Sequence, residues 1–100
     1  MKILIPVNKK DRFLSIISSI EENSAWAVVS LDGAKIVNVE FFDRVEEIFC
    51  LINKLVVIND MEYVWPFLED GIEVLIALKE KSIDEIIESI LLDRLKRINA

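Results

Sequence analysis

Polar side chains follow directly on three apolar runs of this sequence, residues 2–7, 55–58 and 72–78. If these runs are parallel strands, the side chains meet at the edge of the sheet where ligands of open α/β sheets bind. We therefore predict a binding crevice there, although no glycine-rich loop exposes backbone amides to a phosphate. The alternative is that the aspartate caps the next helix and the lysines are solvated. The side chains of this predicted crevice are Asn8, Lys9, Lys10, Asn59, Asp60 and Lys79.

Catalytic and metal-ligating side chains are scarce. The chain has no histidine, which removes the commonest general base and the commonest metal ligand. Its one cysteine, Cys50, follows Glu46 and Glu47 at helical spacing, and these carboxylates favour the thiol over the thiolate. A two-metal nuclease would need carboxylates on the first strand, and residues 2–7 have none. We expect an unreactive surface or interface thiol, no metal site and no enzymatic activity.

The charge balance restricts the partners. With 18 acidic and 12 basic residues the net charge is −6, which argues against nucleic acid because such binding depends on Lys and Arg contacts to phosphates. A single cysteine cannot form an internal disulfide, and we find neither a signal peptide nor an apolar span long enough to cross a membrane. We expect a cytoplasmic protein with no membrane association.

Residues 54–78 give the clearest prediction of the fold. Residues 55–58 and 72–78 are short, β-branched apolar runs without clean alternation, which is typical of parallel strands buried on both faces. Residues 60–70 between them place Met61, Val64, Trp65 and Leu68 on one helical stripe, and Gly71 suits a left-handed helix end. Pro66 requires that the regular helix begins near Trp65 or that it kinks, and we expect Trp65 in the core.

The N-terminal half predicts a meander of three strands. Residues 25–31 and 34–42 flank Asp32-Gly33, a strong signal for a hairpin with a type I′ turn. Polar residues alternate along residues 34–42, which predicts an edge strand. Residues 8–23 fit a helix or, equally, a brief turn followed by an extended piece. This long connection is a candidate for a mobile flap.

Two further helices complete the predicted fold. Asp43 with Glu46 forms a capping-box pattern ahead of an apolar stripe, and Ser82 with Glu85 forms a second one. The order of elements is three strands, helix, strand, helix, strand, helix. We predict one α/β domain over residues 1–100 with a ribonuclease-H-like motif, a five-stranded mixed sheet in the order 3-2-1-4-5 with strand 2 antiparallel, and about three helices. The stripe after Asp43 is formed by Val45, Ile48, Phe49 and Ile52.

The last helix changes its apolar face near its end. Arg94 falls on the line of the earlier isoleucines, and a second stripe begins that is rotated by roughly 80°. Residues 91–98 are therefore expected to protrude and to form a homodimer or to bind a protein partner. The alternative is a bent or frayed tail that folds back on its own domain. The proposed interface residues are Leu91, Leu92, Leu95 and Ile98.

Five segments of the chain resemble the dinitrogenase iron-molybdenum cofactor biosynthesis family, which consists of small nitrogenase accessory proteins and their relatives. The resemblance implies binding or carriage of an iron-sulfur-type or iron-molybdenum-type cluster without turnover chemistry. Cluster-binding members carry a His-Phe-Gly-Arg-like segment and a glycine-rich segment where this chain has SSIEENSA and DRVEEIF, so no ligand residue is carried over. The five segments are KILIPV, AWAVVSLDGAKIVNVEF, LVVI, LEDGIEV and SIDEII.

Two functions follow as hypotheses. The first is a non-catalytic binding or carrier module that resembles the cofactor-biosynthesis accessory proteins and is degenerate at the ligand loops. The alternative is a structural or regulatory interaction domain that acts as a homo-oligomer without a small-molecule ligand.

Overall fold

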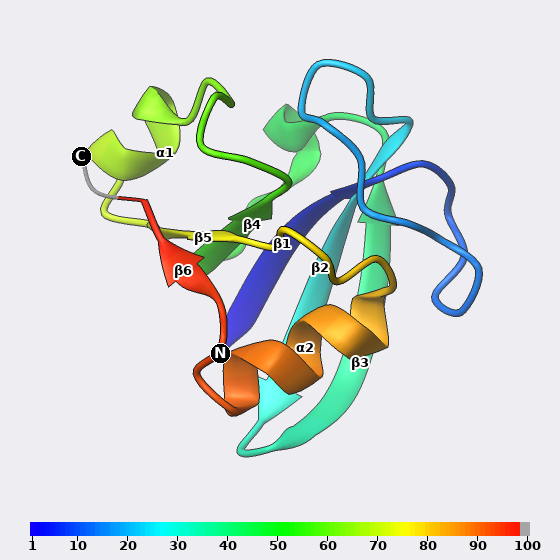
Figure 1. Ribbon diagram of the computed structural model, residues 1–100. Coiled ribbons are helices and arrows are strands. Elements are labelled where there is room, and N and C mark those ends of the chain that lie inside the picture. The colour runs from blue at the N-terminus through cyan, green and yellow to red at the C-terminus, as the bar shows by residue number, and fades with distance from the viewer. Residues whose placement is uncertain (99–100) are drawn as a thin grey trace.

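A mixed six-stranded β-sheet forms the centre of the protein in the computed structural model, which describes residues 1–98. The central strand β1 pairs with β2 in antiparallel and with β4 in parallel orientation, and β5 is parallel to β4 (Figure 1). The predicted arrangement of five strands is present, and β6 extends it beyond β5. The strands are β1 (Lys2–Val7), β2 (Ala25–Asp32), β3 (Lys35–Phe42), β4 (Lys54–Val57), β5 (Glu73–Ile76) and β6 (Lys96–Arg97), in the order β3-β2-β1-β4-β5-β6.

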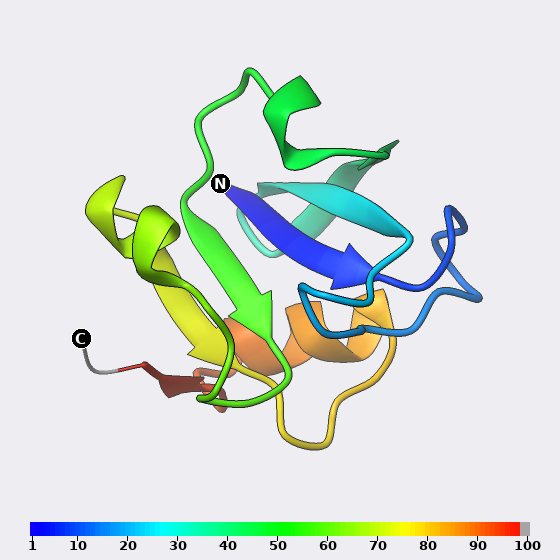
Figure 2. The ribbon, with the colours of Figure 1, turned by 90° about the horizontal axis from the view of Figure 1, so that it is seen from above.

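Two helices and one 3-10 turn cover the sheet. The helix α2 (Ile83–Leu91) lies on one face, and α1 (Trp65–Glu69) lies on the other with the 3-10 turn η1 (Val45–Glu47) (Figure 2). Each face has its own apolar cluster because side chains of a strand alternate between the faces. Within residues 1–98, no helix has the length and apolar character needed to cross a membrane.

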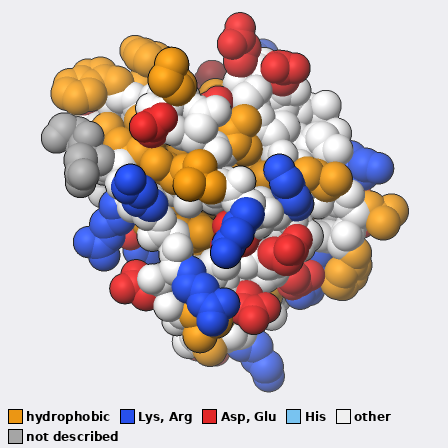
Figure 3. Space-filling view, viewed as in Figure 1, with side chains coloured by type: hydrophobic (Ala, Val, Ile, Leu, Met, Phe, Trp, Pro, Cys, Tyr) orange, Lys and Arg blue, Asp and Glu red, His pale blue; other side chains and the backbone are white. Residues whose placement is uncertain are grey.

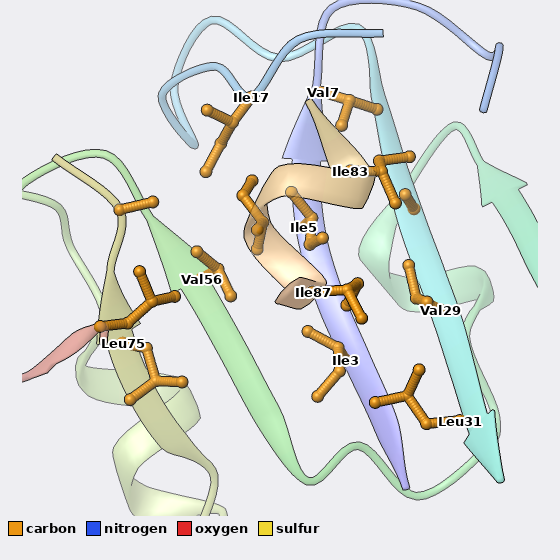
Figure 4. Packing of buried hydrophobic residues seen from close by; sticks show 14 of the residues in the cluster. Ile3, Ile5, Val7, Ile17, Val29, Leu31, Val56, Leu75, Ile83 and Ile87 are labelled. Carbon is orange, nitrogen blue, oxygen red and sulfur yellow. The ribbon is translucent and has the colours of Figure 1, made fainter. Parts of the chain in front are cut away.

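The α2 face has the more complete core. Ile3 and Ile5 of β1 point toward Ile83 and Ile87 of α2, and all four side chains are at most 3% exposed (Figure 4). The predicted capping box begins this helix: the Ser82 hydroxyl accepts the Glu85 backbone N–H at 3.1 Å, and the Glu85 carboxylate accepts the Ser82 N–H at 3.1 Å. Local capping and buried packing therefore select the same helix.

The helix predicted after Asp43 is absent. Only η1 forms, and Ile48 is already extended with φ −92° and ψ 113°. Ile48 and Ile52 reach the sheet from this extended backbone, whereas Phe49 is 95% exposed. So short a helix would derive most of its stability from packing, and here the extended chain packs the same isoleucines.

The connection between β1 and β2 contains turns and no helix. Val7 and Ile17 form an isolated antiparallel bridge, and the Ser18 backbone N–H donates to the Pro6 carbonyl at 2.9 Å. The predicted alternative of a brief turn followed by an extended piece describes this segment.

The hairpin between β2 and β3 turns one residue later than predicted. Asp32 pairs with Lys35, so the turn residues are Gly33 and Ala34, and only Gly33 has a positive φ, of 62°. A type II′ turn has glycine at its first central position and a positive φ at that position only, whereas a type I′ turn has a positive φ at both. The hairpin therefore has a type II′ turn. Further along, Leu31 pairs with Ile36 and Ser30 with Asn38, so that Val37 is an extra, bulged residue on the predicted edge strand.

The helix α1 is shorter than predicted but ends as predicted. It begins at Trp65 with Pro66 in its first turn, where no backbone N–H is needed. Gly71 has φ 78°; its N–H donates to Leu68, and the N–H of Ile72 donates to Phe67, each at 3.0 Å. These two bonds form a Schellman motif. Trp65 is 56% exposed, so its predicted core position is wrong.

The predicted protrusion of residues 91–98 is also wrong. The chain reverses after Leu91, β6 pairs with β5, and the Ile98 N–H donates to the Val74 carbonyl at 2.9 Å. Leu95 is 9% exposed within the α2-side core, and Ile98 packs against the opposite cluster. The tail therefore folds back on its own domain and covers the β5 edge. Leu91 and Leu92 stay exposed, at 41% and 51%.

Asp93 makes this reversal possible at a conformational cost. It has φ 55°, its N–H donates to the Ile90 carbonyl at 3.1 Å, and the N–H of Arg94 donates to the Ser89 carbonyl at 2.8 Å. This is a second Schellman motif, with aspartate in the position that glycine usually occupies. A non-glycine residue in this region is strained, and a carboxylate is unfavourable at a helix C-terminus.

We expect Asp93→Gly to raise the free energy of unfolding by about 0.5–1 kcal/mol, since relief of the strained φ exceeds the extra entropy that glycine gives the unfolded chain. Urea denaturation measures the change. The matched control is Asp93→Ala, which removes the same carboxylate but keeps the strain. An equal gain in both variants would assign the effect to charge rather than to backbone conformation.

A charged group joins the last three strands. The Lys54 Nζ lies 2.6 Å from one Glu73 carboxylate oxygen, and the Arg97 Nε lies 3.4 Å from the other. The Lys54 hydrogen bond lowers the pKa of Glu73, partial burial opposes this, and the charges of Lys54 and Arg97 lower it further, so that it falls below 4.5. Glu73 therefore links β4 and β6 through β5.

This arrangement predicts acid sensitivity. A carboxyl group with a lowered folded-state pKa stabilises the fold above its unfolded pKa, and this contribution disappears as the pH falls through the folded value. We expect Glu73→Gln to lower the urea midpoint at neutral pH and to differ progressively less from the natural protein below about pH 4.5. Glu21→Gln, in the exposed loop between β1 and β2, is the control. A pH-independent difference for Glu73→Gln would contradict the linkage.

Candidate functional site

The carboxyl ends of β1, β4 and β5 are bridged by the long β1–β2 connection. The Ile17 backbone N–H donates to the Lys81 carbonyl at 2.9 Å, which ties this connection to the loop after β5. The Ile20 N–H donates to the Glu62 carboxylate at 2.7 Å, which ties it to the loop after β4. The loops that border the predicted crevice are therefore bonded to one another.

Four residues of the predicted crevice are spread along this edge. The Asn8 side chain accepts the Ile16 N–H at 2.8 Å, and Lys10 forms an ion pair with Asp43 beyond the end of β3. Lys9 is exposed. The Asn59 side chain accepts the Met61 N–H at 2.8 Å, so Asn59 rather than Asp60 caps the turn that follows β4. Each of the two asparagines thus has a local structural role.

The other two residues of the predicted crevice border shallow grooves beside β6. Lys79 lines a hollow of about 300 Å³ with Arg94 and Lys96, and Asp60 lines one of about 280 Å³ with Lys96 and Arg97. The sequence does not predict that these cations lie beside Lys79, because its pattern places residues 94–97 in the last turns of a helix. The signal available was the failure of the apolar stripe at Arg94.

A buried carboxylate lies next to Lys79. Glu80 is 9% exposed, and the Ser89 hydroxyl donates to it at 2.7 Å. Burial alone would raise the pKa of Glu80, but hydrogen bonds from Ser89 and nearby backbone amides, with the charge of Lys79, outweigh it and lower the pKa. Over α2 and β6, Lys and Arg side chains are interspersed with Asp and Glu, so neither sign dominates this face (Figure 3).

An apolar cleft of about 420 Å³ lies on the opposite face, between residues 44–52 and α1. We call it the α1 cleft. Cys50, Leu51 and Asp70 are its more exposed lining side chains. Beside it, Phe67 of α1 packs against Trp26 of β2 with ring centroids 6.1 Å apart. The partly or fully buried lining side chains are Leu4, Val45, Ile48, Ile52, Phe67 and Ile72.

The α1 cleft exists because the two segments that cover this face of the sheet, η1 and α1, are short. One turn of 3-10 helix and five residues of α-helix leave a gap between them, and the buried side chain of Leu4 lies at its floor. A sequence signal was present: residues 48–52 are five consecutive apolar residues, more than one helical stripe can bury. The predicted helix accounted for its own apolar stripe and left the remaining apolar residues of this run without a role.

The chemistry available in the α1 cleft is burial of apolar groups. Among the lining residues, Asp70 and Cys50 are the polar side chains, and Cys50 is exposed. No group of three or more Cys, Asp or Glu side chains that could hold a metal occurs within residues 1–98. The cleft is suited to recognising apolar surface.

Comparison with known proteins relates the chain by fold. No family model matches the sequence, and no curated protein matches it. Solved structures share its α/β fold over nearly the full length of the chain.

One such structure is the 1.70 Å crystal structure of a candidate dinitrogenase (MJ0327) from Methanocaldococcus jannaschii. It has a TM-score of 0.74 and 19% identity, over 99% of this chain and 95% of that one. A second, described only as PH0822, has a TM-score of 0.73 and 16% identity over 97% and 96% of the two chains. At such identities the likeness is one of fold.

Proposed function

We propose that this protein is a non-catalytic binding or carrier module with an accessory role similar to that of the iron-molybdenum cofactor biosynthesis proteins. The observation that carries the proposal is the match in fold to the candidate dinitrogenase over nearly the full length of both chains. With the five segments that resemble the family, it supports one nitrogenase-accessory-factor-like domain over residues 1–100 with a ribonuclease-H-like motif.

The available side chains favour binding over catalysis. The chain has no histidine, and its one cysteine, Cys50, is exposed. The buried carboxylate of Glu80 is engaged by Ser89. We place the protein in the cytoplasm, since a lone thiol suits a reducing compartment.

The segments at which the family holds its ligand have structural roles here. In residues 18–25, the Glu22 N–H donates to the Ser19 hydroxyl at 3.1 Å and the Asn23 amide donates to the Ala25 carbonyl at 2.8 Å. In residues 43–49, the Glu47 carboxylate accepts the Arg44 N–H at 2.8 Å. A cluster carried by this chain would therefore depend on carboxylate ligands or on Cys50.

Anaerobic reconstitution with iron and sulfide tests the carrier role. The carrier role requires that iron and sulfide remain bound after desalting at a level approaching one cluster per chain and that the protein absorbs in the visible. Cys50→Ala is the informative variant: loss of the metal assigns the thiolate as ligand, and retention assigns carboxylates. No iron above that retained by an unrelated histidine-free protein contradicts the carrier role.

The second candidate function is an interaction domain that acts as a homo-oligomer without a ligand. The exposed pair Leu91 and Leu92 at the end of α2 favours it, because neighbouring apolar side chains gain by burial between copies. Leu95 and Ile98, from the same predicted interface, are packed within their own domain and would contribute indirectly, by holding this end of α2.

Size-exclusion chromatography with light scattering tests this alternative. We expect the natural protein to be dimeric and the Leu91→Asp/Leu92→Asp variant to be monomeric, since the charges would have to be buried in the contact. Val37→Asp, at a side chain that is 57% exposed on the opposite edge strand β3, is the matched control and should remain dimeric. A monomeric natural protein refutes the homo-oligomer.

A further inference from the structure

We infer that the α1 cleft is a docking site for a segment of another protein that presents apolar side chains flanked by Lys or Arg. This inference goes beyond the proposed accessory role and does not require a bound cluster. It rests on the apolar surface of the cleft, on the charge around it and on the walls that hold it open.

Apolar surface continues outside the cleft. Phe49 is 95% exposed and Leu51 is 83% exposed, both on the segment that forms one wall. Trp65, at the start of the helix that forms the other wall, is 56% exposed. Clustered exposed aromatic and aliphatic side chains are typical of protein-binding surfaces, and such residues contribute most of the affinity when a partner covers them.

The charge around the cleft is acidic. The two covering segments, residues 43–53 and 65–72, carry five carboxylates and one arginine. The Arg44 Nε lies 3.5 Å from a Glu46 carboxylate oxygen, and Asp43 forms an ion pair with Lys10. The other three carboxylates are exposed and have no side-chain cation within ion-pair distance in the described residues; they are Glu47, Glu69 and Asp70. A partner with basic flanks would be attracted to this rim.

The same features disfavour two other occupants. Small-molecule sites combine an apolar lining with several convergent polar groups, whereas the side chains lining this cleft offer one carboxylate and one thiol. A second copy docked cleft to cleft would bring two acidic rims together in a protein of net charge −6. A basic, apolar protein segment fits both the surface and the charge.

The walls of the cleft are fixed by hydrogen bonds within the protein itself. The Schellman bonds at Gly71 fix the end of α1, and the Glu47 carboxylate holds the Arg44 N–H at the start of η1. Because the cleft needs little ordering on binding, less of the interaction energy is lost to conformational entropy.

Fluorescence anisotropy with a labelled amphipathic peptide, which has Leu and Phe on one face and Lys on the other, tests the inference. We expect saturable binding that weakens as salt is added. Phe49→Ser/Leu51→Ser should weaken binding at least tenfold, and Glu69→Lys/Asp70→Lys should weaken it and flatten its salt dependence. Both pairs are exposed, so circular dichroism should show an intact fold.

Matched controls are Val37→Ser and Leu78→Ser, at side chains 57% and 70% exposed that do not line the cleft. Both should bind as the natural protein does, and amide shifts on peptide titration should concentrate in residues 44–52 and 67–72. Equal binding of a peptide with Glu in place of Lys, equal losses in the controls, or shifts centred on α2 would overturn the inference. Concentration-dependent shifts of the cleft without peptide would assign it to a second copy instead.

Discussion

Burial of β1 on both faces is the constraint on which the rest of the structure depends. Residues 3–7 are at most 1% exposed apart from Pro6, which is also buried, and β1 separates the antiparallel β2 from the parallel β4. A strand covered on both sides needs two apolar layers, and α2 supplies one of them almost alone. The other layer is assembled from two short pieces, so the two faces of the sheet differ in completeness, and the α1 cleft is a result of this difference.

The sequence predicts well those features that local and buried patterns specify together. The strands 2–7 and 55–58, the Ser82 cap and the Gly71 helix end each have one satisfactory arrangement, because turn chemistry and burial favour the same conformation. Predictions fail where one apolar pattern fits two backbones. The spacing of Val45, Ile48 and Ile52 suits a helix, but an extended chain brings the same side chains to the sheet.

Contacts distant in sequence decided the remaining elements. The chain after Leu91 leaves the helix because the edge of β5 offers backbone partners to residues 96–98, and no local signal at Asp93 announces a positive φ. The residues predicted to form the crevice are spread along the sheet edge for a similar reason, since the β1–β2 connection bonds to Lys81 and Glu62, far along the chain. Fold and ligand chemistry are separable: the architecture is shared with structures of 16–19% identity, whereas binding depends on the particular side chains at a site.

Both edge strands of the sheet have features that hinder pairing with a further strand. On one side the Val37 bulge breaks the ladder of β3, and on the other β6 is a two-residue strand made of Lys96 and Arg97. Short, charged or bulged margins hinder a neighbouring molecule from adding its own strand, which is the first step of fibril growth. Margins of this kind disfavour polymerisation through the backbone and favour recognition across a face of the sheet.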